Sequence, residues 1–159
     1  KENGHESKNF FFFFRWILWA VVLITVDHVS KRMLSSSLYL HESVHLTPFF
    51  NITLQHNPGA AFSFLADQGG WQRWFFTGLA VVVSLVILWI LKFKNAKPFM
   101  NFGLVLIMSG AIGNAIDRMQ HGYVIDFLDV YWKTWHYPAF NFADSFITIG
   151  VICLLLDEF

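Results

Sequence analysis

Long apolar blocks constrain this 159-residue chain most strongly, because they leave little room for the core of a soluble domain. The blocks cover about residues 16–33, 74–91, 99–116 and 138–156, and each is close to the ~20 residues that a helix needs to cross a bilayer. A soluble domain of this size interleaves apolar and polar residues instead. The pattern predicts a single membrane domain over residues 1–159, an all-α bundle of four transmembrane helices with a small β element.

The β element is expected in the connection after the first apolar block, at about residues 38–65. Leu38 and Leu40 alternate with polar neighbours, and so do Ile52 and Leu54. Period-two alternation is typical of strands that have one buried face. We therefore predict a small β-hairpin or sheet that lies on the outer, periplasmic surface of the membrane.

Basic residues predict how the chain is oriented. They precede the first apolar block and fill the short link between the second and third blocks (Lys1, Lys8, Arg15; Lys92, Lys94, Lys97). Because cytoplasmic loops are enriched in Lys and Arg, both of these regions are expected in the cytoplasm. The two remaining connections then lie outside, and both termini lie inside.

Polar stretches touch the ends of the apolar blocks, at residues 113–118 (GNAIDR), 123–129 (YVIDFLD) and 141–145 (NFADS). Ionisable groups at membrane depth are energetically costly and usually functional. Three sets of side chains are expected to share helix faces at spacings of three or four residues: Asn114, Asp117 and Arg118; Asn141, Asp144 and Ser145; and Asp27 and Lys31. Since neighbouring helices cross in opposite directions, all three sets are predicted at the same outer level.

Carboxylates gathered at one depth can supply an acid and a base together, because like charges a few ångströms apart raise one pKa. The ionised carboxylate could take a proton from water as the water attacks an amide carbonyl, while the protonated one donates to the carbonyl oxygen. Arg118 is expected to neutralise the remaining carboxylates. By helix geometry, Asp117 is as good a candidate for this pair as Asp126.

Two other interpretations of the polar residues are open. Intramembrane Asp and Asn also bond helices to one another, and Ser109 and Gly113 have the small-residue spacing of close helix packing. A transporter or proton relay also carries acidic residues within its spans. Few spans, no evident inverted repeat and charges at one face count against a transporter. Cys153, the single cysteine, is expected to be a packing residue.

A third alternative is a zinc protease, because His41-Glu42-Ser43-Val44-His45 matches H-E-x-x-H. This motif binds zinc only when both histidines share one helix face and the Glu can act as a base. Here the pentapeptide lies in a short, strand-like stretch that ends at Pro48. The sequence context therefore disfavours a metal site.

Five pieces of the sequence together carry a specific resemblance. They are DHVSK at 27–31, NPGAAFS at 57–63, GNAIDR at 113–118, VIDF at 124–127 and FNFADS at 140–145. In this order the chain resembles the bacterial lipoprotein signal peptidases, or signal peptidase II, which are aspartic proteases of the inner membrane. The family removes the signal peptide from prolipoproteins by cleaving before a cysteine that carries a diacylglyceryl group.

The resemblance implies a role for most of the polar residues. Asp126 and Asp144 match the catalytic pair, and Asn57, Gly59 and Asn141 match positions that line the substrate pocket. The supporting residues are then Asp27, Lys31, Asn114, Asp117 and Arg118. No role transfers to Asp129, which is expected to be solvated on the outer loop.

The resemblance also implies partners and location. Expected partners are a lipid-modified prolipoprotein, membrane lipids and cyclic peptide antibiotics such as globomycin, with no nucleic acid, metal or cofactor. The protein is expected to be a monomer in the bacterial inner membrane, with its active site near the periplasmic face.

Overall fold

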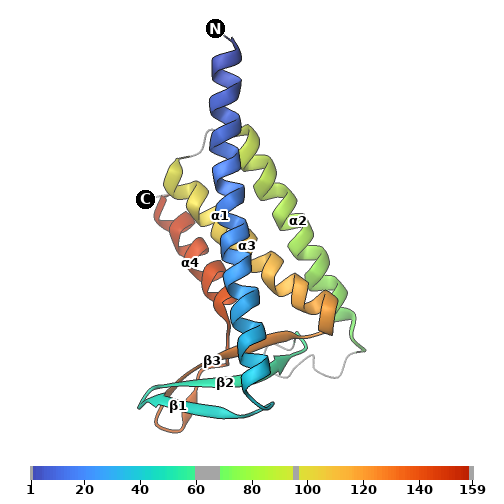
Figure 1. Ribbon diagram of the computed structural model, residues 1–159, viewed down its shortest axis with the longest axis vertical. Helices are drawn as coiled ribbons and strands as arrows, with labels where there is room; N and C mark the ends of the chain where they lie inside the picture. The colour runs from blue at the N-terminus through green and yellow to red at the C-terminus, as the bar shows by residue number, and fades with distance from the viewer. Residues whose placement is uncertain (1, 60–68, 95–96, 158–159) are drawn as a thin grey trace.

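The computed structural model of the protein describes residues 2–59, 69–94 and 97–157, with helices that run alongside one another above a small sheet (Figure 1). The elements in chain order are α1 (Glu2–Ser37), β1 (Ser43–Thr47), β2 (Phe50–Asn57), α2 (Trp71–Phe93), α3 (Pro98–His121), β3 (Val124–Trp132), β4 (Trp135–His136) and α4 (Phe142–Asp157). The sheet lies across the end of the bundle where α1 ends and α4 begins. The opposite ends of α1 and α4 point away from the sheet.

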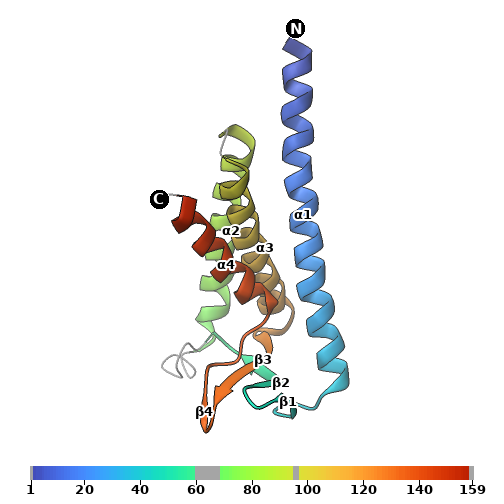
Figure 2. The ribbon, with the colours of Figure 1, turned by 90° about the vertical axis from the view of Figure 1, so that its left-hand side faces the viewer.

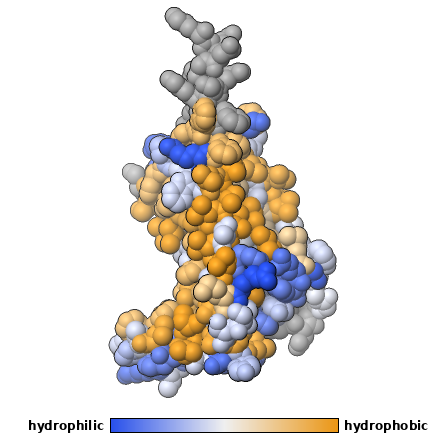
Figure 3. Space-filling view, in the orientation of Figure 1, coloured by the Kyte–Doolittle hydropathy of each residue, from blue (hydrophilic) through white to orange (hydrophobic). Residues whose placement is uncertain are grey.

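Three helical segments in the described part of the chain are long and apolar enough to cross a membrane: Phe11–Ser37, Trp71–Phe93 and Pro98–His121. Three of the four predicted spans are thus helices of spanning length. Apolar side chains cover most of the face shown in Figure 3, and a hydrophilic patch lies nearer the sheet. This distribution is that of an integral membrane protein.

The fourth helix differs from the prediction, because α4 begins at Phe142 rather than near Pro138. The chain before it is held in extended form, since Phe140 pairs with Leu128 of β3. The pairing with β3 therefore costs the fourth predicted span its first turn.

The first helix is longer than the predicted span, since α1 begins at Glu2 and Arg15 does not interrupt it. The Arg15 guanidinium lies 5.1 Å from the ring centre of Phe12 and 5.4 Å from that of Trp16. These aromatic faces attract the cation, so a helix can carry it at the edge of an apolar surface. Figure 2 shows that α1 extends beyond the other helices at the end away from the sheet.

Glycines allow the other elements to approach α3 closely. A Cβ on Gly113 would lie 2.6 Å from Asp27 Oδ2 of α1, and a Cβ on Gly110 would overlap the carbonyl oxygen of Ala143 in α4. The expected close packing at Gly113 is therefore present. Ser109 is fully buried, and its hydroxyl donates to the Val105 carbonyl at 2.7 Å.

The sheet is antiparallel, with strand order β1-β2-β3-β4. Its first two strands lie within the predicted region of residues 38–65, of which residues 60–65 fall outside the described part of the chain. The strand β3 was not predicted, since its residues were assigned to an outer connection between the third and fourth apolar blocks. The pairing of β2 with β3 places Gln55 opposite Asp126.

Candidate active site

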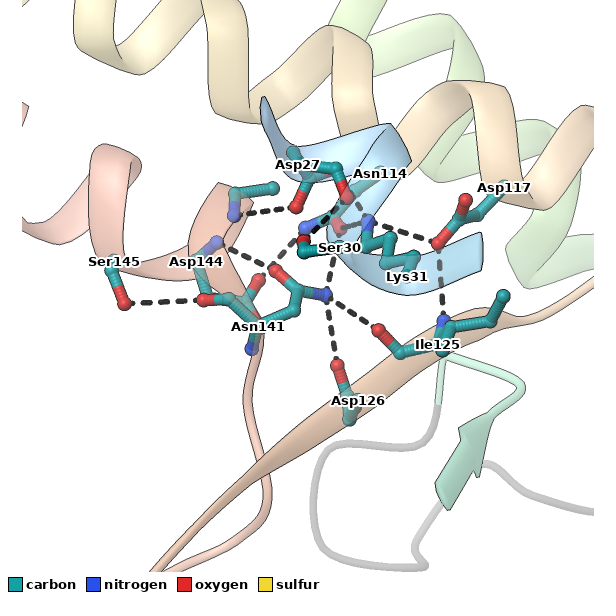
Figure 4. A network of polar contacts seen from close by, with 11 residues as sticks. Asp27, Ser30, Lys31, Asn114, Asp117, Ile125, Asp126, Asn141, Asp144 and Ser145 are labelled. Atoms are coloured by element: carbon teal, nitrogen blue, oxygen red, sulfur yellow. Dashed lines mark hydrogen bonds and ion pairs between the residues drawn. The ribbon is translucent and has the colours of Figure 1, made fainter. Parts of the chain in front are cut away.

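A buried polar cluster lies where α1, α3, β3 and the start of α4 meet (Figure 4). It contains seven of the predicted site residues: Asp27, Lys31, Asn114, Asp117, Asp126, Asn141 and Asp144. Of these, only Asp144 is more than 5% exposed. Residues that are far apart in the sequence therefore form one network that is largely shielded from solvent.

Lys31 is the cation at the centre of the network. Its Nζ lies 2.7 Å from Asp27 Oδ2 and 2.9 Å from Asp117 Oδ2, and it donates to Asn114 Oδ1 at 3.1 Å. Three donors thus meet three acceptors, which is the full capacity of an ammonium group. Lys31, rather than Arg118, therefore makes the direct ion pairs with the carboxylates.

The two carboxylates paired with Lys31 each hold the backbone next to one predicted catalytic residue. Asp27 Oδ1 accepts the Ala143 N–H at 2.9 Å, and Asp117 Oδ2 accepts the Ile125 N–H at 3.1 Å. Ala143 directly precedes Asp144, and Ile125 directly precedes Asp126. Asp27 and Asp117 therefore act on the positions of the other two aspartates, which gives Asp117 a task different from that of Asp126.

Asn141 caps α4 and also reaches across to β3. Its Oδ1 accepts the Asp144 N–H at 2.9 Å, and its own N–H donates to Asp144 Oδ2 at 3.2 Å, a reciprocal arrangement of the capping-box type. Its side-chain amide donates to Asp126 Oδ1 at 2.9 Å. Figure 4 shows Asn141 between the two aspartates.

Asn114 is held in a single orientation. Its Oδ1 accepts from Lys31 and from the Asn141 side chain, both at 3.1 Å. Its Nδ2 must then face the other way, and it donates to Asp144 Oδ1 at 2.7 Å. The chain from Lys31 through Asn114 therefore directs a hydrogen-bond donor at Asp144.

The electrostatic environment distinguishes Asp126 from Asp144. Burial, followed by the nearby charge of Asp144, raises the pKa of Asp126 to about 7, against weaker opposing effects of Asn57, Lys31 and Asn141. Asp144 lies in the first turn of α4, where the helix dipole favours negative charge, and it accepts the hydrogen bonds described above. The arrangement therefore suits Asp126 as the aspartate of the pair that holds a proton.

Each aspartate lines a hollow of its own. Asp126 lines a cleft of about 680 Å³ together with Asn57, Asp129, His136 and Tyr137. Asp144 lines a smaller pocket of about 350 Å³, which Tyr137 also borders. The predicted pairing of these two aspartates at one substrate site is thus compatible with the shape of the surface.

Asn57 and Gly59 were predicted to line the substrate pocket, and the structure gives the two residues different surroundings. Asn57 lies in the cleft, and its Oδ1 accepts the Gly59 N–H at 2.9 Å. Gly59 has a φ of +98° and is buried against α2, where a Cβ would lie 3.1 Å from Gln72 Cβ. Gly59 therefore makes the turn that positions Asn57.

Arg118 and Asp129 lie in surroundings other than those expected. Within the described residues, the Arg118 guanidinium forms no direct ion pair and lies 4.9 Å from the ring centre of Phe76, although its charge interacts with those of Asp144, Asp126 and Asp117. Asp129 is only 7% exposed rather than solvated. It accepts from Asn51 Nδ2 at 2.9 Å and bonds His136 Nδ1 at 2.8 Å, contacts that depend on the unpredicted strand β3.

The H-E-x-x-H pentapeptide lacks the geometry of a zinc site. Residues Ser43–Thr47 form β1, and His41 has a φ of +71°, so the two histidines are not on a helix. His41 Nδ1 contacts Gln55 and His45 Nδ1 contacts Asn51. Among the described residues, no group of three His, Cys, Asp or Glu side chains is placed to hold a metal ion.

The fold is that of a bacterial membrane enzyme. A bacterial membrane enzyme solved by the in meso method at 1.9 Å resolution is 33% identical, with a TM-score of 0.79, and the match covers 91% of this chain and 92% of that one. A family model described as signal peptidase (SPase) II matches residues 19–159. The chain belongs to the signal peptidase II family and is therefore a protease.

Curated relatives agree with this assignment. The lipoprotein signal peptidase of Shewanella loihica is 52% identical over 147 residues, which cover 91% of this chain and 86% of the relative. That of Cupriavidus necator is 47% identical over 143 residues, which cover 90% of this chain and 82% of the relative. The family match at residues 19–159 includes every residue of the polar cluster.

Proposed function

We propose that this protein is an aspartic endopeptidase that removes the signal peptide from diacylglyceryl-modified prolipoproteins, by cleaving before the lipid-bearing cysteine. The observation that carries the proposal is the placement of Asp126 and Asp144 on either side of Asn141, beside a cleft and a pocket. The names of the relatives supply the substrate class.

The proposed reaction begins with a water molecule between the two aspartates. Ionised Asp144 takes a proton from this water as its oxygen bonds to the carbonyl carbon of the scissile amide, and protonated Asp126 donates its proton to the carbonyl oxygen. The C–N bond of the tetrahedral intermediate then breaks. Asp144 returns its proton to the leaving nitrogen, while Asp126 recovers its proton from the hydroxyl as the carbonyl reforms.

The surrounding amides prepare this step. The Asn141 side chain holds Asp126 at Oδ1, while Asn114 and the Asn141 N–H hold Asp144 at Oδ1 and Oδ2, so both carboxyl groups are positioned before substrate arrives. A site whose dipoles are already oriented avoids the cost of rearranging them in the transition state. No metal or cofactor takes part in the proposed steps.

The proposal includes a location. We place the protein in the bacterial inner membrane, as a monomer with both termini in the cytoplasm and the sheet on the periplasmic surface. In this arrangement α4 is the fourth crossing, and the cleft beside Asp126 receives the peptide or a cyclic peptide inhibitor such as globomycin. Basic residues in the link between α2 and α3 support this orientation.

The test is cleavage of a purified lipidated precursor, followed by gel shift, for the wild type, Asp126→Asn and Asp144→Asn. Each variant should lose at least ~100-fold in rate, because general acid and base groups each contribute about 10²–10⁴. Asp157→Asn is the matched control, since Asp157 lies at the far end of α4 and pairs with Lys97.

Circular dichroism and gel filtration establish that each variant folds. Retained cleavage by either active-site variant would remove that residue from the pair. Activity in the presence of a strong chelator is also expected, whereas loss that zinc restores would favour the metalloprotease alternative.

A further inference from the structure

Two hollows of different chemistry meet at one side chain, Tyr137. The cleft beside Asp126 is bordered by polar groups that include Asn57 and His136. The pocket beside Asp144 is lined by Tyr137, Phe140, Ser145, Thr148 and Ile149. Of the described residues that line either hollow, Tyr137 alone lines both.

The pocket is effectively apolar apart from the Asp144 carboxylate. The Ser145 hydroxyl donates to the Asn141 carbonyl at 3.1 Å, and the Thr148 hydroxyl donates to the Asp144 carbonyl at 2.9 Å. Both hydroxyl hydrogens are therefore used within α4 and are not directed at a ligand. At about 350 Å³, the pocket is within the range of small-molecule sites.

The segment that separates the two hollows is fixed at both ends to β3. The Tyr137 N–H donates to the Val130 carbonyl at 2.8 Å, and the Phe140 N–H donates to the Leu128 carbonyl at 3.1 Å. The rings of Tyr137 and Phe140 pack edge to face, with centres 5.9 Å apart. These contacts hold the backbone of the segment against β3 and place the two rings side by side.

We propose that Tyr137 divides the substrate site, and that the pocket between Tyr137 and Ile149 takes the glyceryl thioether and first acyl carbons of the lipid-bearing cysteine. This inference rests on the proposed function. The two residues joined by a bond that is cleaved between Asp126 and Asp144 lie on opposite sides of it. One lies towards the polar cleft beside Asp126, and the other lies towards the apolar pocket beside Asp144. Ile149 is 48% exposed on α4, so acyl chains can leave the pocket directly into the bilayer.

The experiment compares two precursor peptides that differ at the cysteine alone, one with a diacylglyceryl group and one with the deacylated S-glyceryl group. Tyr137→Ala removes the dividing ring, and Ile149→Trp fills the pocket. Each should lower kcat/KM for the diacylglyceryl peptide by about tenfold and for the S-glyceryl peptide by less than about threefold, since apolar pocket contacts discriminate by about 10- to 200-fold.

Two matched variants sharpen the comparison. Tyr137→Phe keeps the ring and should preserve the discrimination between the peptides. Ile152→Trp adds the same bulk on α4 at a residue that does not line the pocket, and it should leave kcat/KM unchanged. If turnover of the S-glyceryl peptide is too slow to measure, competition binding of both peptides to the Asp126→Asn variant gives the same ratio.

Equal losses for both peptides, or no loss in Tyr137→Ala and Ile149→Trp, would overturn the inference. Failure of the proposed function is distinguishable, because the wild type would then cleave neither peptide and Asp126→Asn would change nothing.

Discussion

At the scale of single residues, Lys31 is the group whose removal should be most damaging to stability. Lys31, Asp27 and Asp117 are each no more than 2% exposed, so Lys31→Met leaves two buried carboxylates without their cation. Breaking a buried ion pair in this way costs on the order of 3–5 kcal/mol. We expect a clear fall in the melting temperature of the detergent-purified protein at neutral pH.

Lys97→Met is the control for this prediction, because it removes the same charge from an exposed pair whose atoms are 3.7 Å apart. Exposed pairs contribute little to stability. Equal melting temperatures for the Lys31 and Lys97 variants would show that the buried network does not stabilise the fold.

Asp126 should make the stability of the protein depend on pH. Its pKa rises from 3.8 to about 7 on folding, so between these values the folded protein keeps a proton that the unfolded chain loses. Stability from this group is therefore fully present below about pH 4 and falls as the pH rises towards 7. Asp126→Asn has no such group. The melting temperature of this variant minus that of the wild type should therefore be several degrees larger at pH 8 than at pH 4.

Melting curves of the two proteins from pH 4 to pH 8 measure this difference. Parallel curves would mean that Asp126 does not hold a proton in the folded protein, and would contradict its assignment as the acid.

At the scale of elements, the start of α4 combines a structural task and a catalytic one in Asn141. Its Oδ1 caps the helix, while its amide donates to Asp126. Asn141→Ser retains a capping oxygen but lacks the amide, and Asn141→Ala lacks both. Since a lost cap costs about 1 kcal/mol, the Ser variant should unfold at a higher temperature than the Ala variant.

Both Asn141 variants should nevertheless cleave the lipidated precursor slowly, because neither can hold Asp126. The measurement is a melting temperature beside a cleavage rate for each variant. Recovery of cleavage together with stability in Asn141→Ser would mean that capping is the whole role of this residue.

The elements also show what sequence patterns could and could not predict. Hydropathy located α2 and α3, and the alternation at Ile52 and Leu54 located β2, because both signals are local. The alternation at Leu38 and Leu40 was misleading, since both residues precede β1. The start of α4 was misplaced because Phe140 pairs with Leu128, and β3 was missed because it forms by long-range pairing with β2. The buried contacts of Asp129 with Asn51 and His136 follow from the pairing of β3 with β2 and β4 and had no local signal.

At the scale of the whole molecule, the site belongs to no single element. Lys31 comes from α1, Asn114 from α3, Asp126 from β3 and Asp144 from α4. The sequence motifs identified these residues, but spacing along the chain could not show that Lys31 rather than Arg118 pairs with the carboxylates. That contact exists because Gly113 lets α1 and α3 approach closely.

The orientation of the molecule in the membrane provides the last prediction. If the sheet is periplasmic, the turn between β3 and β4 lies outside and the link after α2 lies inside. In a Cys153→Ala background, Thr134→Cys should react with a membrane-impermeant maleimide in intact spheroplasts, because Thr134 is exposed in that turn. Lys94→Cys, at the exposed end of α2, should react only after the membrane has been permeabilised. The reverse pattern would place Asp126 and Asp144 at the cytoplasmic face, where the signal peptide of an exported precursor is not presented for cleavage.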